Sequence, residues 1–153
     1  MKQFWDDIIE HLKTNLNNVQ DYQEIVKVDY SDDQSVDMNS PHVFIQPLQD
    51  TDAERYDTFD GEVISYCPVQ ITVYCQQMRI NGELLSAKKA SLVLADKISE
   101  LFDKKSAIKW NKNIVLLNRV GEKFGMPVKS GATTYASPLR YEFYIMRNYE
   151  KIN

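Results

Sequence analysis

The stretch VISYCPVQITVYC, residues 63–75, decides the fold of this chain. Most of its apolar residues share one face, which only Ser65 interrupts, whereas tyrosine, glutamine and threonine share the other with Ile64 and Pro68. Since successive side chains of a β-strand point to opposite faces, the alternation predicts a long, half-buried strand. Pro68 lies inside the pattern and cannot donate a hydrogen bond to a neighbouring strand, so it predicts a bulge or an edge position.

A second pattern follows directly. After Asn81-Gly82, a predicted turn, apolar residues recur at steps of three and four from about Glu83 onward. This spacing predicts an amphipathic helix whose apolar stripe packs on the strand before it. The residues of the stripe are Leu84, Ala87, Ser91, Leu94, Ala95, Ile98, Leu101 and Phe102.

The other elements are arranged around this pair. Residues 3–16 have helical periodicity, and the remaining strands are predicted at 42–48, 114–120 and 138–149. Residues 25–28 fit either a short strand or an extra helical turn. Irregular loops are predicted at 49–61 and 121–136. The order predicts a single α+β domain over residues 1–153, with a mostly antiparallel sheet of four or slightly more strands and both helices on one face.

The composition is that of an ordinary globular domain, with 43% hydrophobic and 26% charged residues among 153. No apolar run approaches the roughly 18 residues of a membrane span, so we expect no membrane association. Acidic Asp6 and Asp7 stand where a signal peptide would be apolar, which favours the cytosol. Cys67 and Cys75 would lie about 26 Å apart in one strand, beyond the reach of a disulfide bond.

The charge is unevenly distributed, although the net charge is only −4. Residues 20–62 contain twelve acidic and two basic residues, a net charge of −10. Residues 103–129 contain seven basic and two acidic residues, a net charge of +5. The overall sign argues against nucleic-acid binding through a basic surface. Two explanations of the asymmetry stay open: accident, or copies that meet head to tail.

Residues with catalytic or metal-binding chemistry form no motif. His11 and His42 have no partner at a metal-ligand spacing. The acidic residues from Asp29 to Asp37 lack the glycine of a calcium loop. Lys129 and Ser130 precede Gly131, the reverse of a phosphate-binding loop. We therefore predict no enzyme activity, catalytic residue, cofactor or metal.

The order of the elements resembles the phage tail-terminator family in its lambda-like form. The resemblance covers most of the chain: the N-terminal helix, the strand of residues 43–48, the acidic loop leading to the strand of residues 67–74, the helix of residues 84–102 and the strand of residues 139–145. The chain departs from that family in a longer segment 17–41 and a different loop 121–136.

This resemblance implies a structural virion protein. Members form hexameric rings that cap the finished tail tube, stop its polymerisation and join it to the head. The expected partners are other copies of the chain, the tail tube protein and a head-completion or neck protein, while DNA passes through without specific binding. The expected location is the host cytoplasm during assembly and then the virion tail.

The acidic loop and the basic segment are the predicted interface between copies. Tyr56 and Phe59 could dock on a partner, or fold back on their own sheet. The full set is Asp50, Asp52, Glu54, Tyr56, Asp57, Phe59 and Asp60 on the acidic side, and Lys104, Lys105, Lys109 and Lys112 on the basic side. The alternative functions are another head–tail connector, neck or minor capsid protein, or a small enzyme with an unrecognised site.

Overall fold

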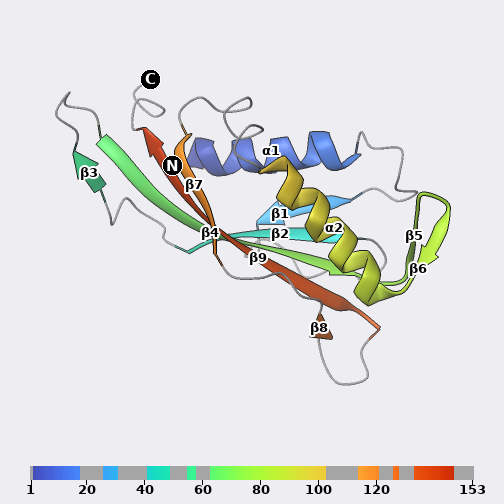
Figure 1. The fold of residues 1–153 in the computed structure, drawn as a ribbon. Coiled ribbons are helices and arrows are strands. Elements are labelled where there is room, and N and C mark those ends of the chain that lie inside the picture. Colours follow the sequence, from blue (N-terminus) through green and yellow to red (C-terminus); the bar gives the residue numbers. More distant parts are fainter. Residues whose placement is uncertain are drawn as a thin grey trace.

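Two helices lie on one side of a mixed β-sheet, which confirms the predicted α+β class (Figure 1). They are α1 (Lys2–Asn17) and α2 (Ala87–Leu101). The computed structural model describes residues 2–17, 26–30, 41–48, 55–57, 63–102, 114–120, 126–127 and 133–146.

The main sheet has the order β1-β2-β4-β9-β7. These strands are β1 (Lys27–Tyr30), β2 (His42–Pro47), β4 (Val63–Cys75), β9 (Tyr135–Met146) and β7 (Ile114–Val120). In addition, β3 (Arg55–Asp57) pairs with β4, and β8 (Met126–Pro127) pairs with β9. All of these pairs are antiparallel except β1–β2, so the sheet is mixed. Residues 27–30 are a strand, which decides between the two predictions for that segment.

Strand β4 lies at the centre of the sheet rather than at an edge, so the edge position predicted from Pro68 is wrong for the strand as a whole. One side of β4 pairs with β9 along residues 64–75. The other side pairs first with β3, through residues 63–65, and then with β2, through residues 69–74. Pro68 lies one position beyond the end of the β2 pairing, where its carbonyl still accepts a hydrogen bond from the Leu48 amide at 2.9 Å. Its missing N–H faces away from β9 and removes no bond of the β4–β9 ladder, which explains how a central strand accepts a proline.

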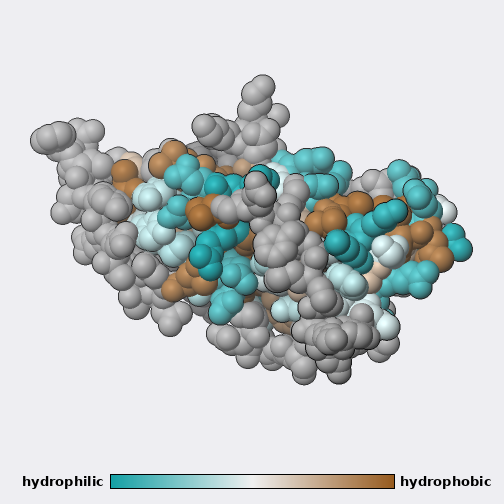
Figure 2. All heavy atoms as spheres, turned by 60° about the horizontal axis from the view of Figure 1, so that its bottom comes forward, coloured by the Kyte–Doolittle hydropathy of each residue, from teal (hydrophilic) through white to brown (hydrophobic). Residues whose placement is uncertain are grey.

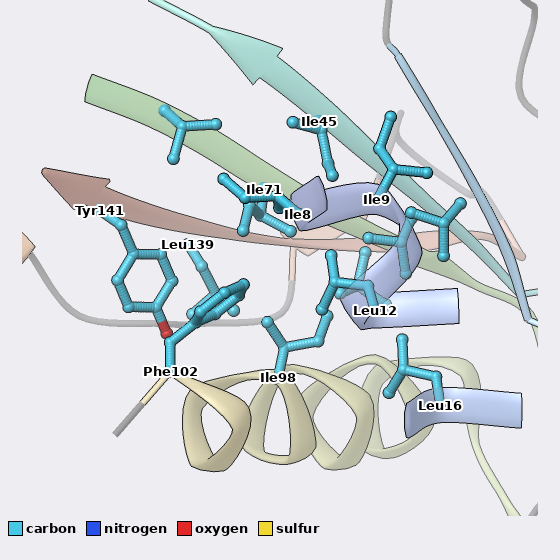
Figure 3. Close-up of a cluster of buried hydrophobic side chains, with 14 of the residues drawn as sticks. Ile8, Ile9, Leu12, Leu16, Ile45, Ile71, Ile98, Phe102, Leu139 and Tyr141 are labelled. Atoms are coloured by element: carbon cyan, nitrogen blue, oxygen red, sulfur yellow. The ribbon is translucent and has the colours of Figure 1, made fainter. Parts of the chain in front are cut away.

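The predicted apolar faces form the core. In β4, Val69, Ile71 and Val73 are fully buried, and β9 buries Phe143 on the same side of the sheet. Figure 3 shows side chains of both helices converging on this face of the sheet. The labelled residues, from helices and strands together, are Ile8, Ile9, Leu12, Leu16, Ile45, Ile71, Ile98, Phe102, Leu139 and Tyr141. One cluster thus includes both helices and one face of the sheet.

The helix after β4 begins later than predicted. The helix was predicted from about Glu83, but Glu83–Leu85 form β6, the hairpin partner of β5 (Met78–Ile80). The turn residues Asn81 and Gly82 have φ angles of 57° and 77°, the left-handed conformation of a tight hairpin. Ser86 then caps α2, because its side chain accepts a hydrogen bond from the amide of Lys89. Leu84, assigned to the helical stripe, is 50% exposed.

The remaining predicted boundaries hold to different degrees. The strand bounds 63–75 and 114–120 are confirmed, and strand 42–48 is one residue shorter. The last strand was predicted at 138–149 but spans 135–146. The two segments predicted as irregular contain β3 and β8. Within the described residues, neither helix is long and apolar enough to cross a membrane.

We predict that the core face of α2 determines stability whereas the adjacent position does not. Leu94 is fully buried and Val93, the next residue, is 36% exposed. Leu94→Ala should lower the free energy of unfolding by about 2–5 kcal/mol because it leaves a cavity. Val93→Ala should change it by less than about 0.5 kcal/mol. Urea denaturation measures both, and similar losses would contradict this packing.

Candidate assembly surfaces

Most of the interface residues predicted from sequence lie outside the described residues. This applies to Asp50, Asp52, Glu54, Phe59 and Asp60, and to Lys104, Lys105, Lys109 and Lys112. For Tyr56 and Asp57 the backbone is described, and it belongs to β3. Tyr56 lies opposite Ile64, and Asp57 lies opposite Val63. The loop predicted as irregular therefore adds a short strand to the start of β4.

The described strands show where the two charged segments join the sheet. β3, part of the acidic segment 49–61, pairs with one side of β4 near residue 64. β7 begins at Ile114, two residues after Lys112. Ile114 lies opposite Ile145 of β9, on the other side of β4. At this end of the sheet the order is therefore β3-β4-β9-β7. The acidic segment joins one flank, and the basic segment leads directly into the opposite flank.

The sheet face away from the helices is polar and aromatic. Tyr66 donates a hydrogen bond to Glu142 across β4 and β9, and its ring lies 5.2 Å from that of Tyr144. Arg140 donates to Gln70 at 3.5 Å. Seen from below, hydrophobic and hydrophilic residues are interspersed over the described part of the molecule (Figure 2). Such a face suits a wet contact rather than a second hydrophobic core.

The β1 flank is acidic and lies beside α1. A hollow of about 430 Å³ between them is lined by Asp6, Ile9, Glu10, Lys13, Val28, Asp29 and Tyr30. The hydroxyl of Tyr30 donates to Asp6 at 2.7 Å. Asp29 accepts a 2.8 Å hydrogen bond from His42, which is only 1% exposed and begins β2. These contacts tie β1 to both α1 and β2 and hold two carboxylates, those of Asp6 and Asp29, on this flank.

The β7 flank differs from the β1 flank in chemistry. Leu116 is 45% exposed and Val120 is 39% exposed. Both share a face with Asn118, whereas Leu117 and Arg119 lie opposite the core residues Phe143 and Tyr141. The strand was predicted from the sequence, but its exposed apolar residues were not. The alternation of residues 116–120 is the signal, although it becomes readable only once the bulge near residue 115 is known.

The side chain of His11, in α1, packs against α2. Its ring lies 5.9 Å from that of Phe102, and its Nε2 hydrogen-bonds to the Leu101 carbonyl at 3.4 Å. Burial lowers the pKa of His11, and the hydrogen bond to Leu101 opposes this effect only in part. His11 therefore serves helix packing.

The other titratable core groups are also chemically quiet. Burial raises the pKa of the Cys67 thiol to about 12, so it is a poor nucleophile. Cys67 and Cys75 are both buried and free of disulfide bonds. Burial also raises the pKa of Tyr141. Among the described residues, no group of three or more His, Cys, Asp or Glu side chains could hold a metal ion.

Comparison with protein-family models and with curated proteins gives no match to this chain.

We predict that His11 makes stability fall on acidification. Its pKa is lower in the folded state than in the unfolded chain, where it is about 6.5. The unfolded state thus binds more protons, and stability is lost as pH drops from about 7.5 through 6.5 toward the folded pKa. His11→Gln, which can still donate to Leu101, should reduce the drop in melting temperature over this range. Thr14→Gln on the exposed side of α1 is the control, and equal drops in both variants would contradict the assignment.

Proposed function

We propose that this chain is a structural subunit of a phage tail, which assembles into a ring that caps the completed tail tube. The ring stops polymerisation of the tube and offers a joining surface to the head. The placement of β3, within the acidic segment, and of β7, which follows the lysines, on opposite flanks of the sheet supports this proposal best. The α+β fold, with both helices on one face, agrees with what the family resemblance implies.

Unlike flanks favour contacts that repeat in one direction. When two copies stand side by side in the same orientation, the acidic flank of one meets the basic flank of the next. Contacts of this head-to-tail type generate a closed ring when the rotation between copies closes. A two-fold contact would instead bring like charges together, which is unfavourable. Six subunits is the number that the resemblance implies.

Charge would orient the subunits, and apolar contacts would hold them. Exposed ion pairs contribute only ~0–1 kcal/mol each, so the lysines and carboxylates cannot stabilise the ring alone. A few buried aromatic residues usually supply most of the interface energy. Tyr56, placed on β3 beside the start of β4, and Phe59 are the proposed anchors.

The proposed partners are further copies of the chain, the tail tube protein and a head-completion or neck protein. The function requires no catalytic residue, cofactor or metal. DNA would pass through the ring without specific binding, because acidic residues that line the channel would repel its phosphates. Assembly would occur in the host cytoplasm, and the ring would remain in the virion tail.

Two pairs of consecutive lysines, one in the basic segment and one on α2, provide the test. The purified chain, added to polymerising tail tube protein from the same phage, should cap tube ends and stop growth in electron micrographs. Lys104→Glu with Lys105→Glu should raise the concentration needed for capping about tenfold at low salt, because two favourable charges are reversed. Lys88→Glu with Lys89→Glu, exposed on α2, should leave capping unchanged.

Two results would overturn the proposal. The first is wild-type protein that neither binds tube ends nor affects tube length. The second is an equal effect of both lysine pairs, which would mean that net charge rather than the flank controls assembly.

A further inference from the structure

The outer edge of β7 has backbone groups that point away from the sheet. The amide of Leu48 donates to the Pro68 carbonyl at 2.9 Å, so the polar backbone atoms of Pro68 face β2. Pro68 and its β9 partner Glu142 are therefore a pair without mutual hydrogen bonds, and Glu142 turns its backbone groups toward β7.

The alternation continues across β7. Asn118 lies opposite Glu142 and bonds to it, so the residues on either side of Asn118 face outward. These are Leu117 and Arg119. In the described part of the chain, no hydrogen bond to their outward amides or carbonyls occurs. With respect to the described residues, two donors and two acceptors thus stand along this edge without a partner.

Side chains on β7 protect the edge only in part. Exposed strands of native proteins usually carry inward-pointing charges or prolines that discourage pairing with another chain. Arg119 is one charge on the core side of the sheet. Residues 116–120 contain no proline, however, and Leu116 and Val120 expose apolar surface beside the outward amides. Such a strand is suited to accept a further strand.

We propose that the open edge of β7 pairs with β1 of a second copy of this chain, so that the sheet continues from one subunit to the next. The inference rests on the ring-forming function proposed above and names its lateral contact. Strand directions favour it: β1 runs with β2 and opposite to β7. Copies placed side by side in one orientation therefore bring β7 and β1 together antiparallel, the more stable arrangement.

Charge favours β1 over a second β7 as the partner. Arg119 lies on the helix side of the sheet, opposite Tyr141. On the same side, the hollow between α1 and β1 is lined by Asp6 and Glu10 as well as Lys13. Pairing β7 with β1 brings Arg119 toward these carboxylates. Pairing β7 with β7 brings two Arg119 side chains toward each other.

A proline substitution tests the open edge. Arg119→Pro removes an outward amide, whereas Arg119→Thr removes the same charge and keeps the amide. Both should keep a melting temperature near that of the wild type, because the ladder to β9 does not use this amide. Arg119→Pro should need at least about tenfold more protein than Arg119→Thr for half-maximal assembly in light scattering.

Lysines on the edge test the same strand without proline. Leu116→Lys with Val120→Lys should also prevent assembly. The matched control is Leu84→Lys with Val93→Lys, which places two charges on equally exposed apolar positions of β6 and α2. The control should assemble normally.

Cysteine cross-linking identifies the partner strand. Arg119→Cys combined with Lys13→Cys should yield a ladder of cross-linked species with a short bis-maleimide, since Cys67 and Cys75 are buried. Arg119→Cys alone should yield monomer. Dimers from the single variant would mean that β7 pairs with β7 and would overturn the proposal.

The outcomes separate this inference from the function on which it rests. Wild-type protein that caps tubes while the edge variants assemble as well as their controls would overturn the β7–β1 contact and leave the function standing. Wild-type protein that stays monomeric at every concentration, with and without tubes, would overturn both.

Discussion

The antiparallel pairing of β4 with β9 is the interaction on which the rest of the structure depends. It aligns residues 64–75 with residues 135–146 and thereby joins the middle of the chain to its end. The pairing places Val69 and Ile71 beside Tyr141 and Leu139, which makes one continuous apolar face. That face is what both helices cover. Without the pairing, neither α1 nor α2 would have a surface on which to bury its stripe.

Local pattern was enough to predict this centre but not its surroundings. Alternation located β4, and three- and four-residue spacing located both helices. The same spacing misplaced the start of α2, because Leu84 fits a helical stripe by chance while Asn81 and Gly82 already form a hairpin turn. Pro68 suggested an edge position because it lacks a backbone N–H. The sequence does not show that the partner of β4 changes from β3 to β2 near this residue. The parallel pairing of β1 likewise depends on a distant partner.

The candidate surfaces were likewise predictable from the sequence only in part. Composition alone revealed the acidic and basic segments and offered them as an interface. It did not reveal that β3 and β7 lie on opposite flanks of one end of the sheet, because this follows from the pairings of β4 with β9. The open amides of Leu117 and Arg119 required the strand register as well. A sheet that ends in two chemically different flanks connects the fold to head-to-tail assembly.

Hydrogen exchange of the free and assembled protein tests the central claim, that the β4–β9 pair organises the subunit and the β7 edge joins subunits. Amides within β4 and β9 should be the most protected and should change little on assembly. The amides of Leu117 and Arg119 should exchange rapidly in the free chain and become protected when copies associate. Two results would contradict the account. The first is an assembled sample in which the amides of Leu117 and Arg119 exchange as they do in the free chain. The second is a free chain in which the β4 amides exchange as fast as the amides of Leu117 and Arg119.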